Sequence, residues 1–436
     1  MNLSGKKVAV LGCGRSGRAA ALLALRDGAA DVRIFDCSDR PERYDEAVPT
    51  VFAATEADGR AFAADLVVIS PGIEADVPWT LSFAEQAEEL IGEMEFSYRH
   101  YEGTIIGITG TNGKTTTTSL VEKILLHSGR KAVACGNYGT PLSEVLLRDE
   151  VPDHLALEVS SFQMETIRDF RPTVGIWLNF APDHMDRYRK VEDYFQAKLR
   201  MFENMTEDQV AVVRVGENLP GIRPRVVEFS SQSDAGQMCY RDGWIMEGGT
   251  PVIDLRGTAM EQAHNAENVM SATLACRAVG IPLEDIVETL RSFLPPAHRC
   301  ETVANIDGIL WLNDSKSTNL HSTEAAIRSQ TRPVVLIAGG KDKGLDYSPV
   351  RDLLRQKVRA CVVFGQIAGQ LRDTFKDVVP TETEETVAGA VAAAARMAGQ
   401  GDVVLFSPGT SSFDQFTGYV QRGEAFREAV KHTLNV

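Results

Sequence analysis

The chain contains 436 residues, of which 44% are apolar and 24% are charged. These fractions are near the averages of soluble globular proteins, so they exclude a largely disordered chain. At about 100–200 residues per domain, the length predicts roughly two to four domains, and we expect three. The net charge of −15 argues against sequence-independent binding to nucleic acid or to an anionic membrane, because both need a positive protein surface.

The cysteines, the histidines and the N-terminal residues exclude further classes of protein. The seven cysteines contain no CxxC pair and the eight histidines no HxxxH pair, which argues against a disulfide framework and a preformed zinc site. The first residues pass directly into a strand, and the sequence has no 18-residue apolar run. We therefore expect a soluble, cytoplasmic protein with reduced thiols. We also expect a monomer, because no coiled-coil pattern suggests obligate assembly.

The first third of the chain alternates apolar strands with helices. Strands are expected at 6–12, 31–36 and 65–72, with a helix at 18–27. This alternation predicts a parallel, doubly wound sheet covered by helices, which is a Rossmann-like arrangement. We place this first domain at residues 1–95.

A glycine-rich turn follows the first strand. Gly12, Gly14 and Gly17 have the spacing of the dinucleotide fingerprint, and Asp36 ends the next strand. The motif needs only an anion at a helix N-terminus and a sugar hydroxyl near the acidic residue. A nicotinamide or flavin would meet that need, and so would a uridine diphosphate. A dinucleotide-dependent oxidoreductase and a tight turn without a ligand are therefore alternatives to a site for a UDP-linked substrate.

A second glycine-rich loop, GITGTNGKTTT, lies between an apolar strand and a helix. Gly110 and Gly113 allow backbone N–H groups to turn inward, Lys114 brings positive charge to the outer phosphates of a nucleotide, and Thr115 offers a hydroxyl to Mg²⁺. The spacing departs from the usual phosphate loop, which has a glycine where Ile108 stands. We predict a nucleotide-phosphate site. The alternatives are a loop that only turns the chain and a nucleotide-switched binding or motor protein.

The strand-helix pattern continues after this loop and resumes after a break at Pro295-Pro296, because consecutive prolines cannot continue a helix. We place a central P-loop-type ATPase α/β domain at 96–296 and a C-terminal Rossmann-like domain at 297–436. The predicted fold class is therefore α/β with three domains. Strands are expected at 131–137, 154–161, 174–180, 209–215, 308–314, 333–340, 359–365 and 402–409, and helices at 263–279 and 283–293.

Two charged side chains stand on otherwise apolar elements of the central domain. Glu158 ends the strand HLALEV, so it should lie at the sheet edge near the phosphate loop. There it could help hold Mg²⁺. The alternative is that Glu158 is a carboxylate at the end of a strand that only contacts solvent. Lys198 shares its helix face with Tyr194 and Phe202, so it lies on the apolar side. A desolvated lysine readily loses its charge, and a neutral amine can react with carbon dioxide to form a carbamate. The alternative is a lysine whose stem covers apolar surface.

Further polar groups follow strands or open helices. Asn268 lies where side chains can meet a purine edge, although its neighbour Asn265 could equally be a helix cap. Arg299, just after the two prolines, suits contact with phosphate. Asp314 and Lys316 follow the strand GILWLN and could reach the nucleotide.

Several motifs, taken in this order, resemble those of the Mur ligases, and the resemblance covers nearly the whole chain. The motifs are GITGTNGKTTTT, LEVSSFQME, NFAPDHMDRY, YFQAKLRMFEN, AHNAEN, HRCE, NDSKSTN and SPGTSSFDQF. Within that family, the DHMDRY and SSFQ forms resemble the ligases that add D-glutamate.

The resemblance implies an activity. ATP would phosphorylate the carboxylate of UDP-N-acetylmuramoyl-L-alanine, and the amine of D-glutamate would attack the acyl phosphate to form an amide bond in peptidoglycan synthesis. ATP and Mg²⁺ are the implied cofactors, and the two small molecules are the implied partners. A related Mur-type ligase that adds another amino acid or L-glutamate is the alternative, because enantiomers differ only in where the same groups point.

The resemblance also implies roles for individual residues. The implied catalytic residues are Lys114, Glu158, His184 and Lys198, and the implied metal ligands are Thr115, Glu158, His184 and Lys198 as its carbamate. ATP contacts are implied at Gly110, Thr111, Asn112, Gly113, Lys114, Thr115, Thr116, Asn268, Arg299, Asp314 and Lys316. UDP-substrate contacts are implied at Gly14, Arg15, Ser16, Asp36, Cys37, Ser70, Pro71, Gly72 and Asn137. D-Glutamate is implied to contact Thr318, Lys343 and Ser412, in a pocket lined by Phe413 and Tyr419.

Overall fold

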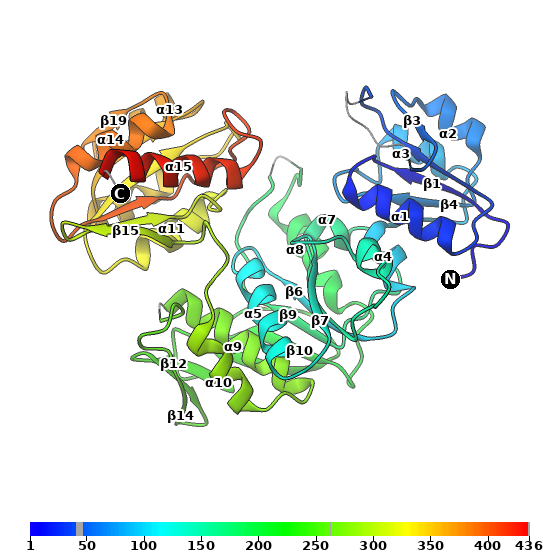
Figure 1. The fold of residues 1–436 in the computed structure, drawn as a ribbon, viewed down its shortest axis with the longest axis horizontal. Coiled ribbons are helices and arrows are strands. Elements are labelled where there is room, and N and C mark those ends of the chain that lie inside the picture. The colour runs from blue at the N-terminus through cyan, green and yellow to red at the C-terminus, as the bar shows by residue number, and fades with distance from the viewer. Residues whose placement is uncertain (41–46, 186, 262, 435–436) are drawn as a thin grey trace. The chain divides into compact units, whose positions relative to one another are not determined.

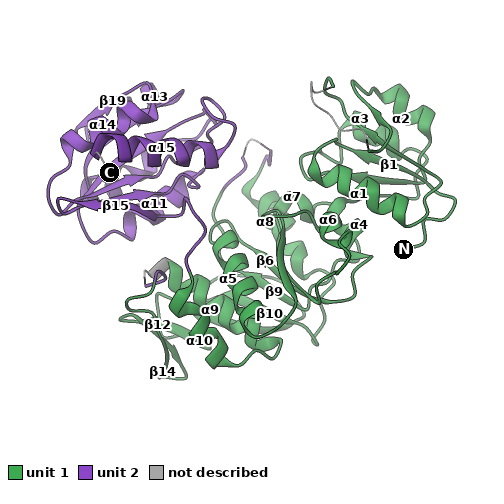
Figure 2. Ribbon diagram, viewed as in Figure 1, with its two compact units in different colours: residues 1–182, 190–258, 265–293 green, residues 183–189, 259–264, 294–436 purple. Residues whose placement is uncertain are grey.

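The computed structural model describes residues 1–40, 47–185, 187–261 and 263–434, and it confirms the α/β class. Three β-sheets follow one another along the chain, each with helices packed on it (Figure 1). The chain divides into two compact units, which Figure 2 colours separately. The first unit holds the first two sheets and comprises residues 1–182, 190–258 and 265–293; the second holds the third sheet and comprises residues 183–189, 259–264 and 294–436.

The first sheet has five parallel strands in the order β3-β2-β1-β4-β5, which confirms the predicted Rossmann-like arrangement. Helix α1 begins at Arg15, earlier than expected, because Gly14 in an extended conformation serves as its N-cap. The strands are β1 Lys7–Leu11, β2 Asp31–Phe35, β3 Thr50–Val51, β4 Leu66–Ile69 and β5 Glu89–Gly92, and the helices are α1 Arg15–Arg26, α2 Glu56–Phe62 and α3 Pro78–Ala84.

The second sheet has nine strands in the order β14-β13-β12-β11-β10-β9-β6-β8-β7. The strand that leads into the phosphate loop, β6, lies in its interior between β9 and β8. The strands are β6 Thr104–Thr109, β7 Ala132–Gly136, β8 His154–Glu158, β9 Val174–Trp177, β10 Val210–Arg214, β11 Arg225–Ser230, β12 Met238–Arg241, β13 Trp244–Glu247 and β14 Thr250–Asp254. The helices are α4 Glu93–Tyr98, α5 Lys114–His127, α6 Leu142–Leu146, α7 Ser161–Met164, α8 Val191–Leu199, α9 Ala263–Ala278 and α10 Leu283–Ser292, with a 3₁₀ turn at Arg200–Phe202.

The strands β12, β13 and β14 form an antiparallel extension that the doubly wound pattern did not predict. Turn signals for this extension are present in the sequence. Asp242-Gly243 joins β12 to β13, Gly248-Gly249 joins β13 to β14, and all four residues have positive φ. Such pairs are favoured in two-residue hairpin turns, because both central residues need positive φ there.

The third sheet has six strands in the order β15-β16-β20-β17-β18-β19. It is parallel except for β15, which pairs antiparallel with β16 through a turn at Asp307-Gly308 and was not predicted. The strands are β15 Glu301–Ile306, β16 Ile309–Asn313, β17 Val334–Gly339, β18 Val358–Phe364, β19 Thr381–Thr383 and β20 Val403–Phe406. The helices are α11 Leu320–Arg328, α12 Arg351–Lys357, α13 Ala368–Phe375, α14 Val387–Met397 and α15 Tyr419–Leu434, with a 3₁₀ turn at Ser348–Val350.

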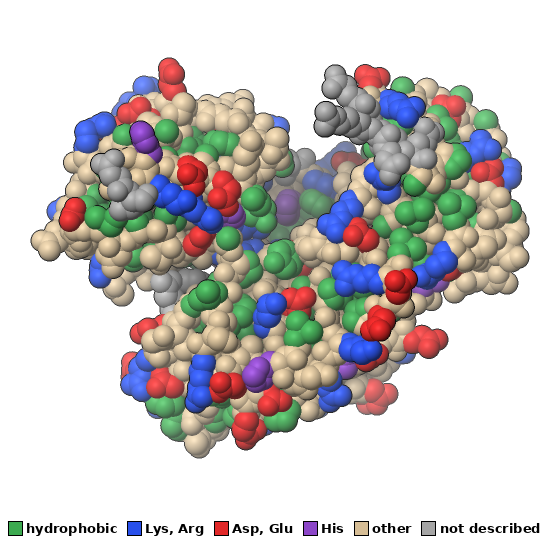
Figure 3. Space-filling model, in the orientation of Figure 1, with side chains coloured by type: hydrophobic (Ala, Val, Ile, Leu, Met, Phe, Trp, Pro, Cys, Tyr) green, Lys and Arg blue, Asp and Glu red, His purple; other side chains and the backbone are tan. Residues whose placement is uncertain are grey.

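Two further properties concern the charges at the surface and the apolar character of the helices. On the face drawn in Figure 3, Lys and Arg side chains are interspersed with Asp and Glu side chains. Over the described residues, no helix combines the length and the apolar character that are needed to cross a membrane.

A buried carboxylate on α4 fastens the loop that leads into β9. Glu95 is fully buried, and its two oxygens accept hydrogen bonds from the backbone N–H groups of Arg168, Asp169 and Phe170 at 2.9 to 3.0 Å. Arg99, the C-cap residue of α4, lies 2.9 Å from the same carboxylate. Burial of a charge is costly unless the charge is paired and hydrogen-bonded, and these four contacts meet that condition.

We expect Glu95→Ala to lower the free energy of unfolding by about 3 kcal/mol or more, because it leaves three backbone N–H groups and a guanidinium without their acceptor. Glu88→Ala is the matched control. Glu88 pairs with Lys6 at the surface, and its side chain is 66% exposed, so its removal should change stability by less than about 1 kcal/mol. Urea titration of both variants measures the difference, and equal losses would contradict this account of Glu95.

Candidate active site

The phosphate loop joins β6 to α5 and needs glycine at its last position. Gly113 is the N-cap of α5 with a φ of 85°, and a Cβ atom there would lie 2.3 Å from Asn268 Oδ1. Asn268 is itself buried, and its Oδ1 accepts a hydrogen bond from Thr117 Oγ1 at 3.2 Å. The structure therefore brings Asn268, the predicted adenine contact, to the predicted phosphate loop.

The loop after β9 holds the phosphate loop from the side. Thr111 Oγ1 donates to the carbonyl oxygen of Ala181 at 3.0 Å, and the N–H of Ala181 donates back to Thr111 Oγ1 at 3.0 Å. The N–H of Asn112 donates to Asn179 Oδ1 at 2.9 Å, and the N–H of Thr111 donates to the Asn179 carbonyl at 2.9 Å. Both N–H groups are thus bonded within the protein, so the first turn of α5 supplies the N–H groups that can face a phosphate.

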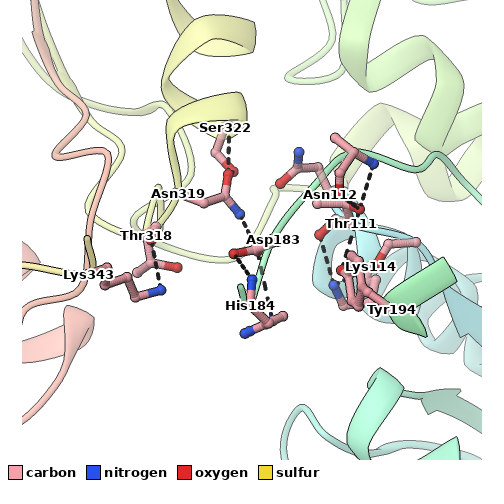
Figure 4. Close-up of polar contacts among 12 residues, drawn as sticks. Thr111, Asn112, Lys114, Asp183, His184, Tyr194, Thr318, Asn319, Ser322 and Lys343 are labelled. Carbon is pink, nitrogen blue, oxygen red and sulfur yellow. Dashed lines mark hydrogen bonds and ion pairs between the residues drawn. The ribbon is translucent and has the colours of Figure 1, made fainter. Parts of the chain in front are cut away.

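Two lysines meet at one backbone oxygen in this loop. Lys114 Nζ donates to the carbonyl oxygens of Gly110 and Thr111 at 2.9 Å each, and Lys198 Nζ donates to the Gly110 oxygen at 2.8 Å (Figure 4 shows Lys114 beside Thr111). Lys198 is 1% exposed, and its ammonium lies 4.8 Å from the centre of the Tyr194 ring. The expectation that Lys198 lies on the apolar side of its helix is confirmed.

Glu158 ends β8, directly beside the β6 residue Ile108, and so reaches the same sheet edge as the phosphate loop. Its Oε1 accepts a hydrogen bond from Asn137 Nδ2 at 2.7 Å. Its Oε2 is buried and has no hydrogen-bond partner among the described residues. A buried carboxylate oxygen without a donor suits a cation, and Thr115, also buried, places a hydroxyl at the start of α5. Mg²⁺ is held by one or two carboxylates together with phosphate oxygens, so these residues fit a magnesium nucleotide.

The glycine-rich turn of the first sheet lies at the switch point between β1 and β4. A Cβ atom at Gly17 would lie 1.9 Å from the Gly12 carbonyl, so only glycine fits there. Asp36 accepts hydrogen bonds from the N–H of Cys13 at 2.8 Å and from the N–H and hydroxyl of Ser38. Burial alone would raise the pKa of Asp36, but these hydrogen bonds outweigh it and lower the pKa below its usual value. The carboxylate is therefore ionised and ready to accept a sugar hydroxyl.

Other residues predicted to contact the UDP-linked substrate differ in their surroundings. Ser70 follows β4, and a Cβ atom at Gly12 would lie 2.8 Å from its hydroxyl. Cys37 is exposed and lies shortly after the end of β2. Arg15, by contrast, forms a bidentate pair with Glu144 at 2.6 and 2.8 Å and donates to the Gly139 carbonyl at 3.2 Å. Its guanidinium thus connects α1 to α6 and to the loop before it.

In the second unit, the loop after β16 carries Asp314 and Lys316. Asp314 is buried, and it accepts hydrogen bonds from Ser407 Oγ at 2.8 Å and from the N–H of Cys300 at 3.3 Å. Burial raises the pKa of Asp314 to about 6, although those hydrogen bonds stabilise its charged form. Lys316 Nζ lies 4.3 Å from the centre of the Tyr419 ring. The structure therefore brings Lys316 to Tyr419.

Arg422 holds this loop in place, and the sequence did not indicate it. The residue is fully buried on α15 and donates to the carbonyl oxygens of Ser315 at 2.8 Å and Thr410 at 3.0 Å. It thereby joins the loop after β16 to the loop after β20. Burial lowers the pKa of Arg422 to about 10, which leaves it charged at neutral pH. No local signal could have found it, because a helical arginine usually extends to solvent.

The predicted D-glutamate contacts lie on three loops and at the start of α15 in the second unit. Lys343 Nζ donates to the Thr318 carbonyl at 3.4 Å (Figure 4), Ser412 is buried, and the Phe413 side chain is 65% exposed. The chain turns after Ser412, and α15 begins only at Tyr419.

Two hydrogen bonds hold the chain where it enters α15. The N–H and hydroxyl of Thr417 both donate to Gln421 Oε1, at 2.8 and 3.1 Å.

Family comparisons match most of the chain in three segments. Residues 108–276 match the Mur ligase middle domain, and residues 298–409 match the Mur ligase, glutamate ligase domain. Residues 2–75 match the NADPH-binding domain of acetohydroxy acid isomeroreductase. This last match covers only the first sheet and agrees with its Rossmann-like strand order.

Curated relatives span the whole chain. The UDP-N-acetylmuramoylalanine--D-glutamate ligase of Geotalea uraniireducens is 35% identical over 99% of this chain and 98% of its own. Those of Syntrophotalea carbinolica and Aquifex aeolicus are 38% and 37% identical, each over 98% of both chains. Among solved structures, the UDP-N-acetylmuramate-alanine ligase of Thermotoga maritima has a TM-score of 0.63 at 18% identity, covering 98% of this chain and 100% of that one. The MurF ligase of the same organism, solved with ADP, has a TM-score of 0.61 at 15% identity and covers 99% and 95%.

We expect Gly113→Ala to weaken binding of an ATP analogue by about tenfold or more, because the added Cβ atom forces Asn268 away and strains the loop. Gly129→Ala is the matched control. Gly129 also has positive φ, 79°, but nothing lies within 4 Å of its Cβ position. Titration with a fluorescent ATP analogue measures both variants, and unchanged affinity for Gly113→Ala would contradict the geometry assigned to this loop.

Proposed function

Because the chain belongs to the Mur ligase family, we propose that it adds D-glutamate to UDP-N-acetylmuramoyl-L-alanine with consumption of ATP, in peptidoglycan synthesis. Mur ligases are ATP-dependent and act on small molecules. The observation that carries the proposal is the similarity to D-glutamate ligases over 98% or more of this chain, joined to a phosphate loop that ends against Asn268.

The first sheet is the proposed site for the uridine diphosphate. Its glycine-rich turn and the ionised Asp36 suit a sugar linked to a diphosphate, and they do not distinguish a uridine from a nicotinamide nucleotide. The full-length relatives are ligases, which favours the uridine. The proposed contacts are Gly14, Arg15, Ser16, Asp36, Cys37, Ser70, Pro71, Gly72 and Asn137.

The reaction has two steps. A carboxylate oxygen of the UDP-linked substrate attacks the γ-phosphorus of ATP, and the bond from that phosphorus to ADP breaks. The amine of D-glutamate then attacks the acyl carbon, the carbon–oxygen bond to phosphate breaks, and the amine loses a proton. The first step is needed because hydroxide is a poor leaving group, whereas phosphate is a good one.

The residues of the first unit bind and orient the phosphates. The N–H groups at the start of α5 face the phosphate oxygens, and the Lys114 ammonium offsets the negative charge on the transferring group. Thr115, Glu158 and Lys198, as its carbamate, would hold Mg²⁺, which supplies further neutralisation of phosphate charge when bound. Asn268 would contact the adenine.

The residues of the second unit complete the set of proposed contacts. His184 is the further proposed metal ligand, and Arg299, Asp314 and Lys316 are proposed to bind the nucleotide. D-Glutamate carries two carboxylates and an ammonium, so it needs a cation and hydroxyl donors. Lys343, Thr318 and Ser412 supply these, and Phe413 and Tyr419 are proposed to line the pocket.

The compartment is part of the proposal. All seven cysteines are free thiols, and four of them are buried. Reduced thiols are usual where glutathione and thioredoxin are present, and ATP and UDP-linked sugars are available in the same compartment. We therefore place the reaction in the cytoplasm.

We expect rapid phosphate release only when ATP, UDP-N-acetylmuramoyl-L-alanine and D-glutamate are all present. D-Glutamate should support a rate about a hundredfold higher than L-glutamate or other amino acids, because a site built around placed hydrogen bonds rejects a substrate whose groups point elsewhere. A phosphate-release assay scanned across amino acids measures this. Equal release without any amino acid would indicate a simple ATPase, and faster release with another amino acid would indicate a different ligase.

The carbamate proposal has its own test. We expect Lys198→Ala to lower the turnover rate by about a hundredfold or more, and acetate or formate to restore part of it by taking the place of the carbamate. Lys123→Ala is the control, because Lys123 lies on α5 with a side chain that is 56% exposed. The thermal midpoint of each variant is measured alongside turnover. A folded Lys198→Ala protein with full activity would refute the carbamate.

A further inference from the structure

Asn319 carries a side-chain amide whose two ends are bound to different partners. It is the N-cap of α11, and its Oδ1 accepts hydrogen bonds from the N–H and the hydroxyl of Ser322 at 2.8 Å each. Its Nδ2 donates to Asp183 Oδ2 at 2.7 Å (Figure 4). The amide orientation follows from chemistry, because helix N–H groups need an acceptor and a carboxylate needs a donor.

Asp183 in turn sets the backbone of His184. The other carboxylate oxygen, Oδ1, accepts the N–H of His184 at 2.8 Å, and the imidazole Nε2 lies 3.8 Å from Oδ2 (Figure 4). His184 has a φ of 56°, in the left-handed region that L-residues rarely adopt, so its conformation needs support. The carbonyl oxygen of His184 also closes a turn by accepting the N–H groups of Arg187 and Tyr188 at 3.0 and 2.9 Å.

The contact between Asn319 and Asp183 is shielded from water. Asn319 is 8% exposed, and the Asp183 side chain is 13% exposed. A hydrogen bond to an ionised acceptor is stronger than one between neutral groups, and little solvent competes for it here. The segment 183–189 follows β9 in the chain, yet it belongs to the compact unit of Asn319.

We propose that Asn319 is a positioning residue for His184, acting through Asp183. The turn after β16 then contributes two neighbouring residues. Thr318 contacts the amino acid, and Asn319 holds the segment that carries His184, the proposed metal ligand. This inference rests on the proposed function, because it takes the roles of Thr318 and His184 from it. Neither Asn319 nor Asp183 touches a reacting atom in this account.

The variant Asn319→Asp separates the two ends of the amide. Aspartate is as good a helix cap as asparagine, so α11 keeps its N-terminus. The donor to Asp183 is lost, and a carboxylate faces a carboxylate instead. The exchange variant, Asp183→Asn with Asn319→Asp, restores one donor and one acceptor with the partners reversed and leaves the net charge unchanged. Thr386→Ala, which removes the cap of α14 where the Thr386 hydroxyl accepts the Gly389 N–H at 3.1 Å, is the control for general loss of stability.

The first readout needs neither metal nor turnover. Trypsin cleaves after Arg187 and Arg189, within the segment that Asn319 holds. In the full-length protein without metal, we expect Asn319→Asp to raise the cleavage rate at these sites about tenfold, as located by mass spectrometry, because proteolysis follows the population of the released segment. The exchange variant should return cleavage to the rate of the unmodified protein, and Thr386→Ala should leave it unchanged.

The second readout is the Mg²⁺ concentration that gives half-maximal phosphate release. We expect Asn319→Asp to raise it about tenfold while the KM for the UDP-linked substrate stays the same, since residues that orient a metal ligand affect metal affinity on this scale. Two results would overturn the inference. One is that trypsin cleaves Asn319→Asp at the rate of the unmodified protein. The other is that it cleaves the exchange variant as fast as Asn319→Asp. If instead the proposed function is wrong, the unmodified protein itself will show no turnover.

Discussion

The carbonyl oxygen of Gly110 accepts hydrogen bonds from two lysines, Lys114 at 2.9 Å and Lys198 at 2.8 Å. One lysine comes from the first turn of the helix after the phosphate loop and the other from a helix much later in the chain. Two ammonium groups at one oxygen repel each other, and Lys198 is also removed from water. The shared oxygen thus joins the start of α5 to α8 at the phosphate loop.

Each compact unit arranges its polar side chains through internal contacts. In the first unit, the pairs Thr111 with Ala181 and Asn112 with Asn179 bind the phosphate loop to the loop after β9. In the second unit, Arg422 binds two loops at the ends of β16 and β20. Positioning of this kind matters for phosphoryl transfer, where most of the catalytic work is orientation and charge stabilisation. The buried groups that hold the loops are therefore as much part of the site as the residues expected to touch substrate.

Much of the fold could be predicted because parallel α/β units leave strong local signals. Runs of buried apolar residues marked β1, β4, β8, β17 and β20, and glycines and prolines marked the turns between them. The antiparallel edges were missed although Asp242-Gly243 and Asp307-Gly308 indicate hairpins, because a pattern of alternating strands and helices gives no reason to expect them.

The sequence by itself determined the chemistry that is available: a glycine-rich loop with Lys114 and Thr115, a strand that ends in Glu158, a lysine on an apolar helix face, and a second glycine-rich turn with its acidic partner Asp36. These features are local, because the spacing of residues along one strand, turn or helix decides them. Only the tertiary structure decided which of these groups meet. That Lys198 reaches Gly110, that Asn268 closes on Gly113, that Arg422 lies buried between two loops and that Asn319 holds Asp183 all depend on contacts between segments far apart in the chain. Packing sets such contacts, and no residue spacing along the chain encodes them.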